Sequence, residues 1–247
     1  MSQLPSFHRL TSPTSFYFLR HGESVSNASA RIQGRSESPL SDAGRIHAAS
    51  AGKWFADRSV DLVFTSPLSR ARETAEIVAK TTSAGGPVVL TDLLELDTGA
   101  FTGMSLKEAA KAHPKVFGEF QVHSWEAVPG AESVSSLAER ARSAWSRLID
   151  EANGGNENLL CVTHGGMLQW LVKVTLAQDP IEWMPIFPTA NCGIFHFFAR
   201  PNGNGGYFGT WEGINVLPYD VAEAPSSGMA DLVGPGKSSQ PRGTQAR

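Results

Sequence analysis

The sequence predicts an α/β fold built on a mostly parallel sheet. Short apolar runs alternate along the chain with longer segments whose apolar residues recur at helical spacing. Gly, Pro, Asn and Ser separate the two kinds of segment. Strands that alternate with helices form parallel sheets, and their right-handed crossover connections lay the helices against the sheet.

The short apolar or aromatic runs predict strands at residues 15–19, 61–64, 88–90, 159–162, 194–198 and 206–216. The longer segments predict helices that begin near residue 40, span 68–81, begin at 133 and span 167–176, with short helices near 107 and 116. Ser41 is the expected N-cap of the first helix. An Asn-Gly-Asn-Gly-Gly turn is expected to join the last two strands.

The length of 247 residues predicts one domain. We expect residues 1–14 to be an N-terminal extension and residues 15–220 to form the domain, with a cap insertion at about 98–130. Residues 221–247 are rich in Gly, Pro and Ser and are expected to be disordered. Cys161 and Cys192 lie in apolar surroundings and are expected to be buried thiols.

The composition argues against several classes of protein. The net charge is −3 and no block of like charge occurs, so we expect no nucleic-acid partner. No apolar run approaches the ~18 residues of a membrane span, and the first residues lack the pattern of a signal peptide. We therefore expect a cytoplasmic protein with no membrane partner, and the sequence leaves a homodimer open.

Reactive side chains follow four of the predicted strands. Arg20 and His21 end the first strand, and Arg70 follows the second. The third leads towards Glu95, and His164 ends the fourth. Because ligands bind beyond the carboxyl ends of parallel strands, these five side chains are expected to share one rim. Arginines bind phosphate or carboxylate, a neutral histidine is a competent nucleophile, and a carboxyl group can relay a proton, so the set predicts a phosphate or carboxylate site.

Short motifs that contain these residues, in this order, resemble the histidine phosphatase superfamily, which includes the cofactor-dependent phosphoglycerate mutases. The resemblance covers most of residues 16–198. It implies a three-layer α/β/α sandwich of the phosphoglycerate mutase type with a small helical cap. The motifs are Leu19-Arg20-His21-Gly22-Glu23-Ser24 with Asn27, Gln33-Gly34 followed by Pro39-Leu40-Ser41, Thr65-Ser66-Pro67-Leu68-Ser69-Arg70-Ala71, Leu94-Glu95, Val128-Pro129-Gly130-Ala131-Glu132-Ser133, and Val162-Thr163-His164-Gly165-Gly166.

The resemblance also implies a role for each matching residue. His21 would be the phosphorylated nucleophile and Glu95 the proton donor, with Asp97 as the second candidate for the acid. The residues that would hold the phosphoryl group are Arg20, Arg70 and His164, assisted by Asn27 and Gly165. Gln33 and Gly34 would touch the substrate. Arg72 is expected to point away from the site, and neither a metal nor a cofactor is implied.

Three functions remain open at this level. The first is a metal-independent phosphomonoester hydrolase of the histidine acid phosphatase type, acting on a small-molecule substrate through a phosphohistidine. The second is a mutase, in which a bound phosphoester takes the phosphoryl group back. The third is a phosphoester-binding or regulatory module without catalysis, which the complete set of reactive residues disfavours.

Two departures from the mutase pattern favour the hydrolase. Mutases of this type carry an aromatic residue shortly after the acid, where this chain has Thr98. They also bind a second acidic group of the substrate with paired arginines, whereas residues 101–130 of this chain contain lysines but no arginine. Four aromatic residues of this insertion either contact an apolar or sugar-like substrate or pack the cap onto the sheet: Phe101, Phe117, Phe120 and Trp125.

Overall fold

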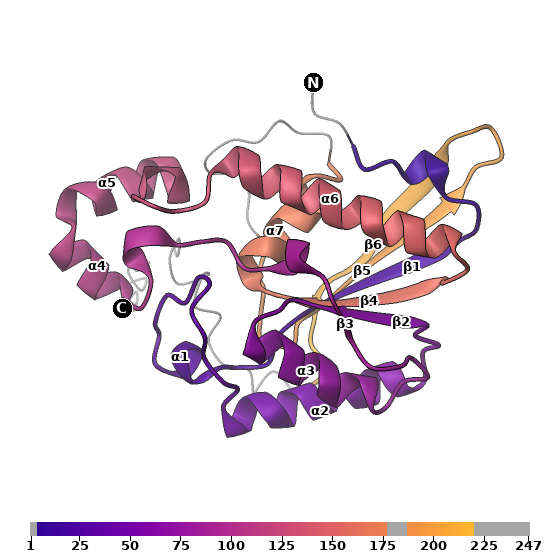
Figure 1. Ribbon diagram of the computed structural model, residues 1–247, viewed down its shortest axis with the longest axis horizontal. Coiled ribbons are helices and arrows are strands. Elements are labelled where there is room, and N and C mark those ends of the chain that lie inside the picture. The colour runs from indigo at the N-terminus through magenta and orange to yellow at the C-terminus, as the bar shows by residue number, and fades with distance from the viewer. Residues whose placement is uncertain (1–3, 177–186, 220–247) are drawn as a thin grey trace, which may run out of the picture.

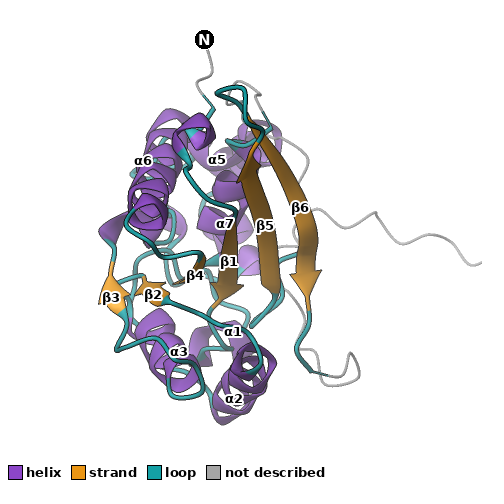
Figure 2. Cartoon of the chain, turned by 90° about the vertical axis from the view of Figure 1, so that its right-hand side faces the viewer, coloured by secondary structure: helices purple, strands orange, loops and turns teal. Residues whose placement is uncertain are grey.

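The computed structural model describes residues 4–176 and 187–219. A six-stranded sheet runs through the molecule in the order β3-β2-β4-β1-β5-β6, with helices on both faces (Figures 1 and 2). The α/β/α sandwich predicted from the sequence is confirmed. The tail from residue 221 onwards, which was predicted to be disordered, lies outside the described residues.

The strands run as the sequence predicts, with small shifts at their ends. They are β1 (Thr14–Arg20), β2 (Leu62–Thr65), β3 (Val88–Val89), β4 (Asn158–Thr163), β5 (Ile194–Pro201) and β6 (Tyr207–Val216). The first four are parallel to one another, whereas β5 runs antiparallel to β1 and β6 runs antiparallel to β5. Arg20 lies opposite Thr163 at the ends of β1 and β4, so both strands deliver their following residues to the same edge.

The side chains of β1 alternate between two hydrophobic cores. Phe16 and Phe18 pack on one side of the sheet, and Tyr17 and Leu19 pack on the other. The first core lies beneath α6 (Val134–Asn153) and α7 (Gly165–Lys173), and the second beneath α2 (Asp42–Ala56) and α3 (Ser69–Ala79). A strand covered on both faces buries successive side chains in opposite directions, which is why its sequence is continuously apolar.

Capping side chains set where the helices begin. Ser41 accepts a hydrogen bond from the Gly44 N–H at 3.0 Å and caps α2, as expected from the sequence. Helix α7 begins at Gly165, two residues before its predicted start, and His164 is its N-cap residue. Gly165 and Gly166 therefore lie in the first turn of α7, where backbone N–H groups have no partner within the helix.

The cap insertion forms one end of the molecule, where it contains α4 (Leu106–Ala112) and α5 (Pro114–His123) (Figure 1). These are the two short helices that the sequence predicted. The 3₁₀ turns η3 (Gly99–Phe101) and η4 (Ser124–Ala127) flank them. The rings of Phe101 and Phe120 are buried with centroids 5.6 Å apart, so these aromatic residues pack the cap.

The N-terminal segment has a packing role that its sequence does not reveal. Phe7, in the 3₁₀ turn η1 (Phe7–Arg9), is fully buried, and its ring centroid lies 4.9 Å from that of Trp145. Two other short elements, α1 (Val25–Ala28) and η2 (Thr91–Leu93), lie in loops near the predicted site. In the part of the chain that is described, no helix combines the length and apolar character needed to span a bilayer.

Candidate active site

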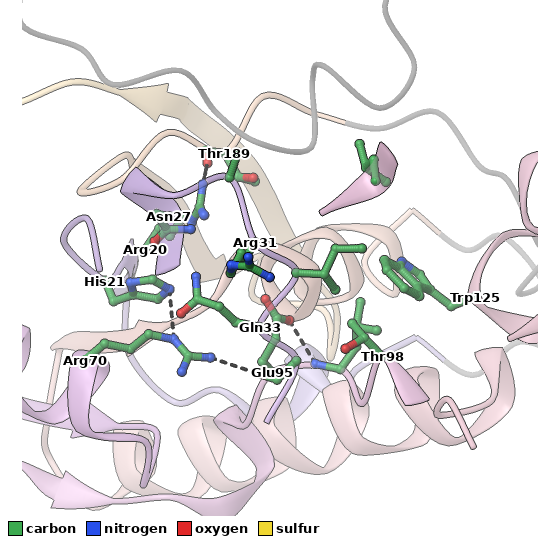
Figure 3. Close-up of a pocket in the computed structure, with 16 residues that line it drawn as sticks. Arg20, His21, Asn27, Arg31, Gln33, Arg70, Glu95, Thr98, Trp125 and Thr189 are labelled. Atoms are coloured by element: carbon green, nitrogen blue, oxygen red, sulfur yellow. Dashed lines mark hydrogen bonds between the residues drawn. The ribbon is translucent and has the colours of Figure 1, made fainter. Parts of the chain in front are cut away.

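A pocket of about 190 Å³ lies beyond the carboxyl ends of β1 and β4 (Figure 3). Its lining contains all but one of the predicted site residues: Arg20, His21, Asn27, Gln33, Gly34, Arg70, Glu95 and Gly165. The remaining one, His164, is fully buried beside the pocket, with its ring centroid 5.0 Å from that of His21. The structure therefore brings the reactive residues from four strand ends into one place, as the sequence predicted.

The His21 imidazole is held by a different partner at each ring nitrogen. Nδ1 lies 2.7 Å from the Gly22 carbonyl oxygen, which can only accept, so Nδ1 carries the proton. Arg70 donates its Nε–H to Nε2 at 3.3 Å. Burial and then the charges of Arg70 and Arg20 hold the pKa of His21 well below its usual range. His21 is thus a neutral imidazole with its lone pair on Nε2.

Arg70 is fixed by the loop that follows α1. Its Nη1 and Nη2 groups each donate to a carbonyl oxygen at 2.8 Å, those of Ser36 and Gly34 respectively. Its side chain comes from the first turn of α3, and burial lowers the pKa of its guanidinium to about 10. The chain thus places a buried cation directly against the His21 ring.

Two buried side-chain nitrogens in the cluster have no hydrogen-bond partner among the residues that the structure describes. One is Arg20 Nε, although Nη1 of the same side chain donates to the Thr189 carbonyl. The other is His164 Nδ1, whose opposite nitrogen lies 2.7 Å from the Ser66 hydroxyl. A buried unsatisfied donor costs about 1–3 kcal/mol, and an anionic oxygen can satisfy it. These groups fit a site that receives a phosphoryl group.

The Glu95 carboxylate lies at the N-terminus of α7. It accepts N–H groups from Gly166 and Met167, both at 3.1 Å, and from Leu96 at 2.8 Å. A Cβ atom on Gly166 would lie only 2.4 Å from Glu95 Oε1, so this approach requires glycine. The Gly166 amide therefore binds the carboxylate of Glu95.

Asp97, the second candidate for the acid, does not line the pocket. Its Oδ1 accepts the Gly99 N–H at 2.9 Å, which fixes the start of η3. Arg72 is exposed on α3 and is also outside the lining, as the sequence predicted. Glu95 is thus the better placed of the two carboxylates.

The predicted substrate contacts are held by the loop around α1. Gln33 accepts the Ser24 hydroxyl at 2.9 Å, and Asn27 accepts the Ser24 N–H at 3.1 Å. Gly34 has φ of +52°, and a Cβ there would lie 2.3 Å from the Thr98 hydroxyl oxygen. Glycine is therefore needed where this loop passes the segment that bears the acid.

Arg140, on α6, supports the acid-bearing segment and had no marked role in the sequence. It donates to both carboxylate oxygens of Glu132, at 3.0 and 2.7 Å. It also donates to the carbonyl oxygens of Asp92, Leu94 and Glu95, at 3.0, 2.5 and 3.4 Å. Because a charged residue on an amphipathic helix normally faces solvent, the sequence pattern could not indicate this contact.

Comparison with known proteins fits this geometry. The family model of the histidine phosphatase superfamily, branch 1, matches residues 16–205. A metal-independent phosphoserine phosphatase of Arabidopsis thaliana is 34% identical over 67% of this chain and 71% of its own length. Phosphoglycerate mutase-like protein 4 of the same plant is 35% identical over 63% of this chain and 68% of its own length.

Solved structures give the same picture. Bacillus stearothermophilus YhfR superposes with a TM-score of 0.70 at 28% identity, covering 83% of this chain and all of that one (100%). The strand order, the pocket and the matched residues lead to one conclusion: the chain belongs to branch 1 of the histidine phosphatase superfamily.

Proposed function

We propose that this chain hydrolyses small-molecule phosphate monoesters through a phosphohistidine on His21, with Glu95 as the general acid and base. The observation that carries the proposal is the fixed tautomer of His21. Gly22 holds the proton on Nδ1, and the lone pair of Nε2 faces Arg70. A neutral, positioned imidazole is the form of histidine that can attack phosphorus.

In the first step, His21 Nε2 forms a bond to phosphorus while the bond from phosphorus to the ester oxygen breaks. The protonated form of Glu95 gives its proton to that departing oxygen, which leaves as an alcohol. Arg20 and Arg70, together with His164 in the tautomer that carries its proton on the unpartnered Nδ1, stabilise the negative charge on the phosphoryl oxygens.

In the second step, the Glu95 carboxylate takes a proton from water, and the water oxygen attacks phosphorus. The bond between nitrogen and phosphorus breaks, which releases phosphate and restores neutral His21. The charges in this scheme all come from side chains of the protein. We therefore propose that the hydrolase needs no metal ion and belongs to the histidine acid phosphatase type.

The competing function is phosphotransfer of the mutase type, and both kinds of name occur among the relatives. The pocket argues for water as the acceptor. Among the described lining residues, the cation outside the phosphate cluster is Arg31, which already donates to Glu108 at 3.2 Å. A bisphosphorylated intermediate would have weak support for its second phosphate there.

The proposal is tested by hydrolysis of a chromogenic aryl phosphate in excess chelator. We expect full activity with chelator. In a second measurement the enzyme is mixed with labelled substrate and quenched, and we expect the labelled phosphoenzyme to survive an alkaline quench but not an acid quench. His21→Ala should abolish both turnover and labelling. The mechanism would be contradicted if chelator removed the activity and a metal restored it. It would also be contradicted if the His21→Ala protein became labelled.

A second assay separates the hydrolase from the mutase. The enzyme is incubated with 3-phosphoglycerate and a trace of 2,3-bisphosphoglycerate, and the products are followed with time. We expect free phosphate as the main product. Appearance of 2-phosphoglycerate before free phosphate would establish the mutase instead.

A further inference from the structure

The pocket has an outer half that the phosphate chemistry does not use. We define it as Ile32, Leu96, Leu106 and Trp125, with Arg31 at the rim; all five line the pocket. Trp125 and Leu106 come from the cap, whereas Ile32 belongs to the loop after α1. Figure 3 shows Trp125 far from His21, with Glu95 between them. The group attached to the phosphate therefore faces side chains from the cap.

The wall of this outer half is built before any substrate arrives. The Trp125 ring packs against Phe120, with centroids 4.9 Å apart, and is itself buried. The Ile32 N–H donates to the Met104 carbonyl at 2.8 Å, and the Ile32 carbonyl accepts the Gly103 N–H at 2.7 Å. These hydrogen bonds join the loop after α1 to the cap, so the apolar side chains are held in place from both sides.

The polar groups beside this wall are already engaged within the protein. Arg31 donates to the Gly103 carbonyl at 2.6 Å and to Glu108 at 3.2 Å. The hydroxyl of Thr98 lies 2.7 Å from that of Thr102. A carboxylate on the substrate would have to compete with Glu108 for Arg31, and an apolar group would meet no such competitor.

We propose that the outer half selects substrates whose leaving group is an apolar alcohol, aryl or alkyl, rather than an anionic glycerate. The inference rests on the proposed hydrolase function and names the substrate class of that same site. A cavity of about 150 Å³ lined by apolar side chains binds benzene, so a pocket of about 190 Å³ that also opens to solvent admits a phosphoryl group with a substituent of this kind.

The test compares 2-phenylethyl phosphate with 3-phosphoglycerate. Both are esters of primary alcohols, so their leaving groups place similar demands on Glu95. We expect kcat/KM to be at least about tenfold higher for 2-phenylethyl phosphate, because a well-filled apolar pocket gives discrimination of this size. His21→Ala is measured with both substrates, to show that each is processed at the same site.

Leu106→Gln tests the wall without disturbing the core of the cap, because Leu106 is only half-buried in the first turn of α4. We expect it to lower the ratio of kcat/KM for 2-phenylethyl phosphate to kcat/KM for 3-phosphoglycerate about tenfold. Val122→Gln is the matched control, since Val122 is exposed on α5, outside the pocket. It should change neither value.

Glu108→Gln tests the engagement of Arg31. It removes the charge of the carboxylate, while the amide oxygen can still cap α4 in place of the carboxylate that accepts the Ser105 N–H. We expect kcat/KM for 3-phosphoglycerate to rise a few-fold, which is about the strength of an exposed ion pair, and that for 2-phenylethyl phosphate to stay constant.

The outcomes separate this inference from the function on which it rests. If 3-phosphoglycerate is hydrolysed as well as 2-phenylethyl phosphate, and both depend on His21, the inference is overturned and the hydrolase stands. An equal loss for both substrates in Leu106→Gln also overturns it. If hydrolysis of both substrates persists in His21→Ala, the proposed function fails and the inference fails with it.

Discussion

At His21, the feature that decides its chemistry is which ring nitrogen carries the proton. The positions of His21, Arg20 and Arg70 after predicted strands indicated that they share one rim, and the family resemblance implied that His21 is the nucleophile. The sequence could not predict the tautomer, because that depends on the direction of the Gly22 carbonyl, 2.7 Å from Nδ1. Gly22 is held in turn by Thr74, whose hydroxyl accepts its N–H at 3.0 Å. The tautomer of the proposed nucleophile thus depends on backbone geometry that the residue types do not reveal.

The buried histidines make the stability of the protein depend on pH. Burial, followed by the charge of Arg70, holds the pKa of both His21 and His164 well below the usual value. In the unfolded chain they titrate near ~6.5, so below that pH the unfolded state binds more protons and the free energy of unfolding falls. As the pH falls, each histidine lowers the free energy of unfolding by about 1.4 kcal/mol per pH unit, until the pH reaches the pKa of that histidine in the folded state.

We therefore expect His164→Asn to remove about 1.4 kcal/mol per pH unit from this slope between pH ~6.5 and ~5. The measurement is urea unfolding of wild type and variant at several pH values in that interval. The comparison uses the difference in slope, because carboxyl groups contribute equally to both proteins. Parallel curves for the two proteins would contradict a buried neutral His164.

Glu95 is the residue whose substitution should depend most on the substrate. We expect Glu95→Gln to lower kcat by about 10²–10⁴-fold for alkyl phosphates, the usual worth of a general acid. The loss should be smaller for aryl phosphates, whose leaving groups need less help from a proton. Asp97→Asn is the matched control, because Asp97 lies outside the pocket. An equal loss for alkyl and aryl phosphates would assign Glu95 a structural role.

At the scale of elements, the active site depends on a bridge between α6 and the segment that bears the acid. The Glu132 carboxylate accepts a hydrogen bond from Arg140 on α6. It accepts a second one, at 2.9 Å, from Arg35 in the loop after α1. Although burial opposes it, the hydrogen bonds and charges of these arginines lower the pKa of Glu132. The Glu132 carboxylate thus joins α6 to the loop after α1, while Arg140 itself joins α6 to the segment that bears Glu95.

Arg140→Met should therefore affect catalysis and stability together. We expect kcat to fall about 10–10²-fold through displacement of Glu95, with little change in KM. The free energy of unfolding should fall by about 3 kcal/mol, since Glu132 loses its bidentate partner. Arg147→Met, on the same helix, removes only an exposed pair with Glu151 and should cost less than about 1 kcal/mol.

Steady-state kinetics on an alkyl phosphate and urea unfolding provide the two measurements for Arg140→Met. If kcat is unchanged while stability falls, Arg140 supports the fold alone and does not position Glu95. Arg140→Lys should recover part of the stability but not the bidentate contact, because lysine lacks the forked donor.

The elements with a strong sequence period were the ones that could be predicted. The apolar runs gave β1 and β4 to within a residue or two, and the helical spacing gave α2, α3 and α6. The short α1 was missed because four residues are too few to show a period. Helix α7 starts earlier than predicted because the N–H groups of its first turn donate hydrogen bonds to the Glu95 carboxylate. This contact joins residues far apart in the sequence, so no local pattern indicates it.

At the scale of the whole molecule, the N-terminal segment and the candidate active site lie at opposite ends of β1. The residues that precede β1 enter one core, whereas those that follow β1 form the active site. Phe7 contacts the rings of Trp145, Phe197 and Tyr207, which belong to α6, β5 and β6. The segment that the sequence predicted to be an extension therefore joins three elements of the domain.

This separation predicts that Phe7 contributes to stability without contributing to turnover. Phe7→Ala leaves a cavity among aromatic rings and should lower the free energy of unfolding by about 3–5 kcal/mol. Below the unfolding transition, kcat/KM for an aryl phosphate should equal that of the wild type. Leu4→Ala is the control, because Leu4 is largely exposed (41%) and should cost less than about 1 kcal/mol. A drop in kcat/KM of Phe7→Ala in the folded state would show that the two ends of β1 are coupled, because relaxation of the core would then have reached the residues that follow β1.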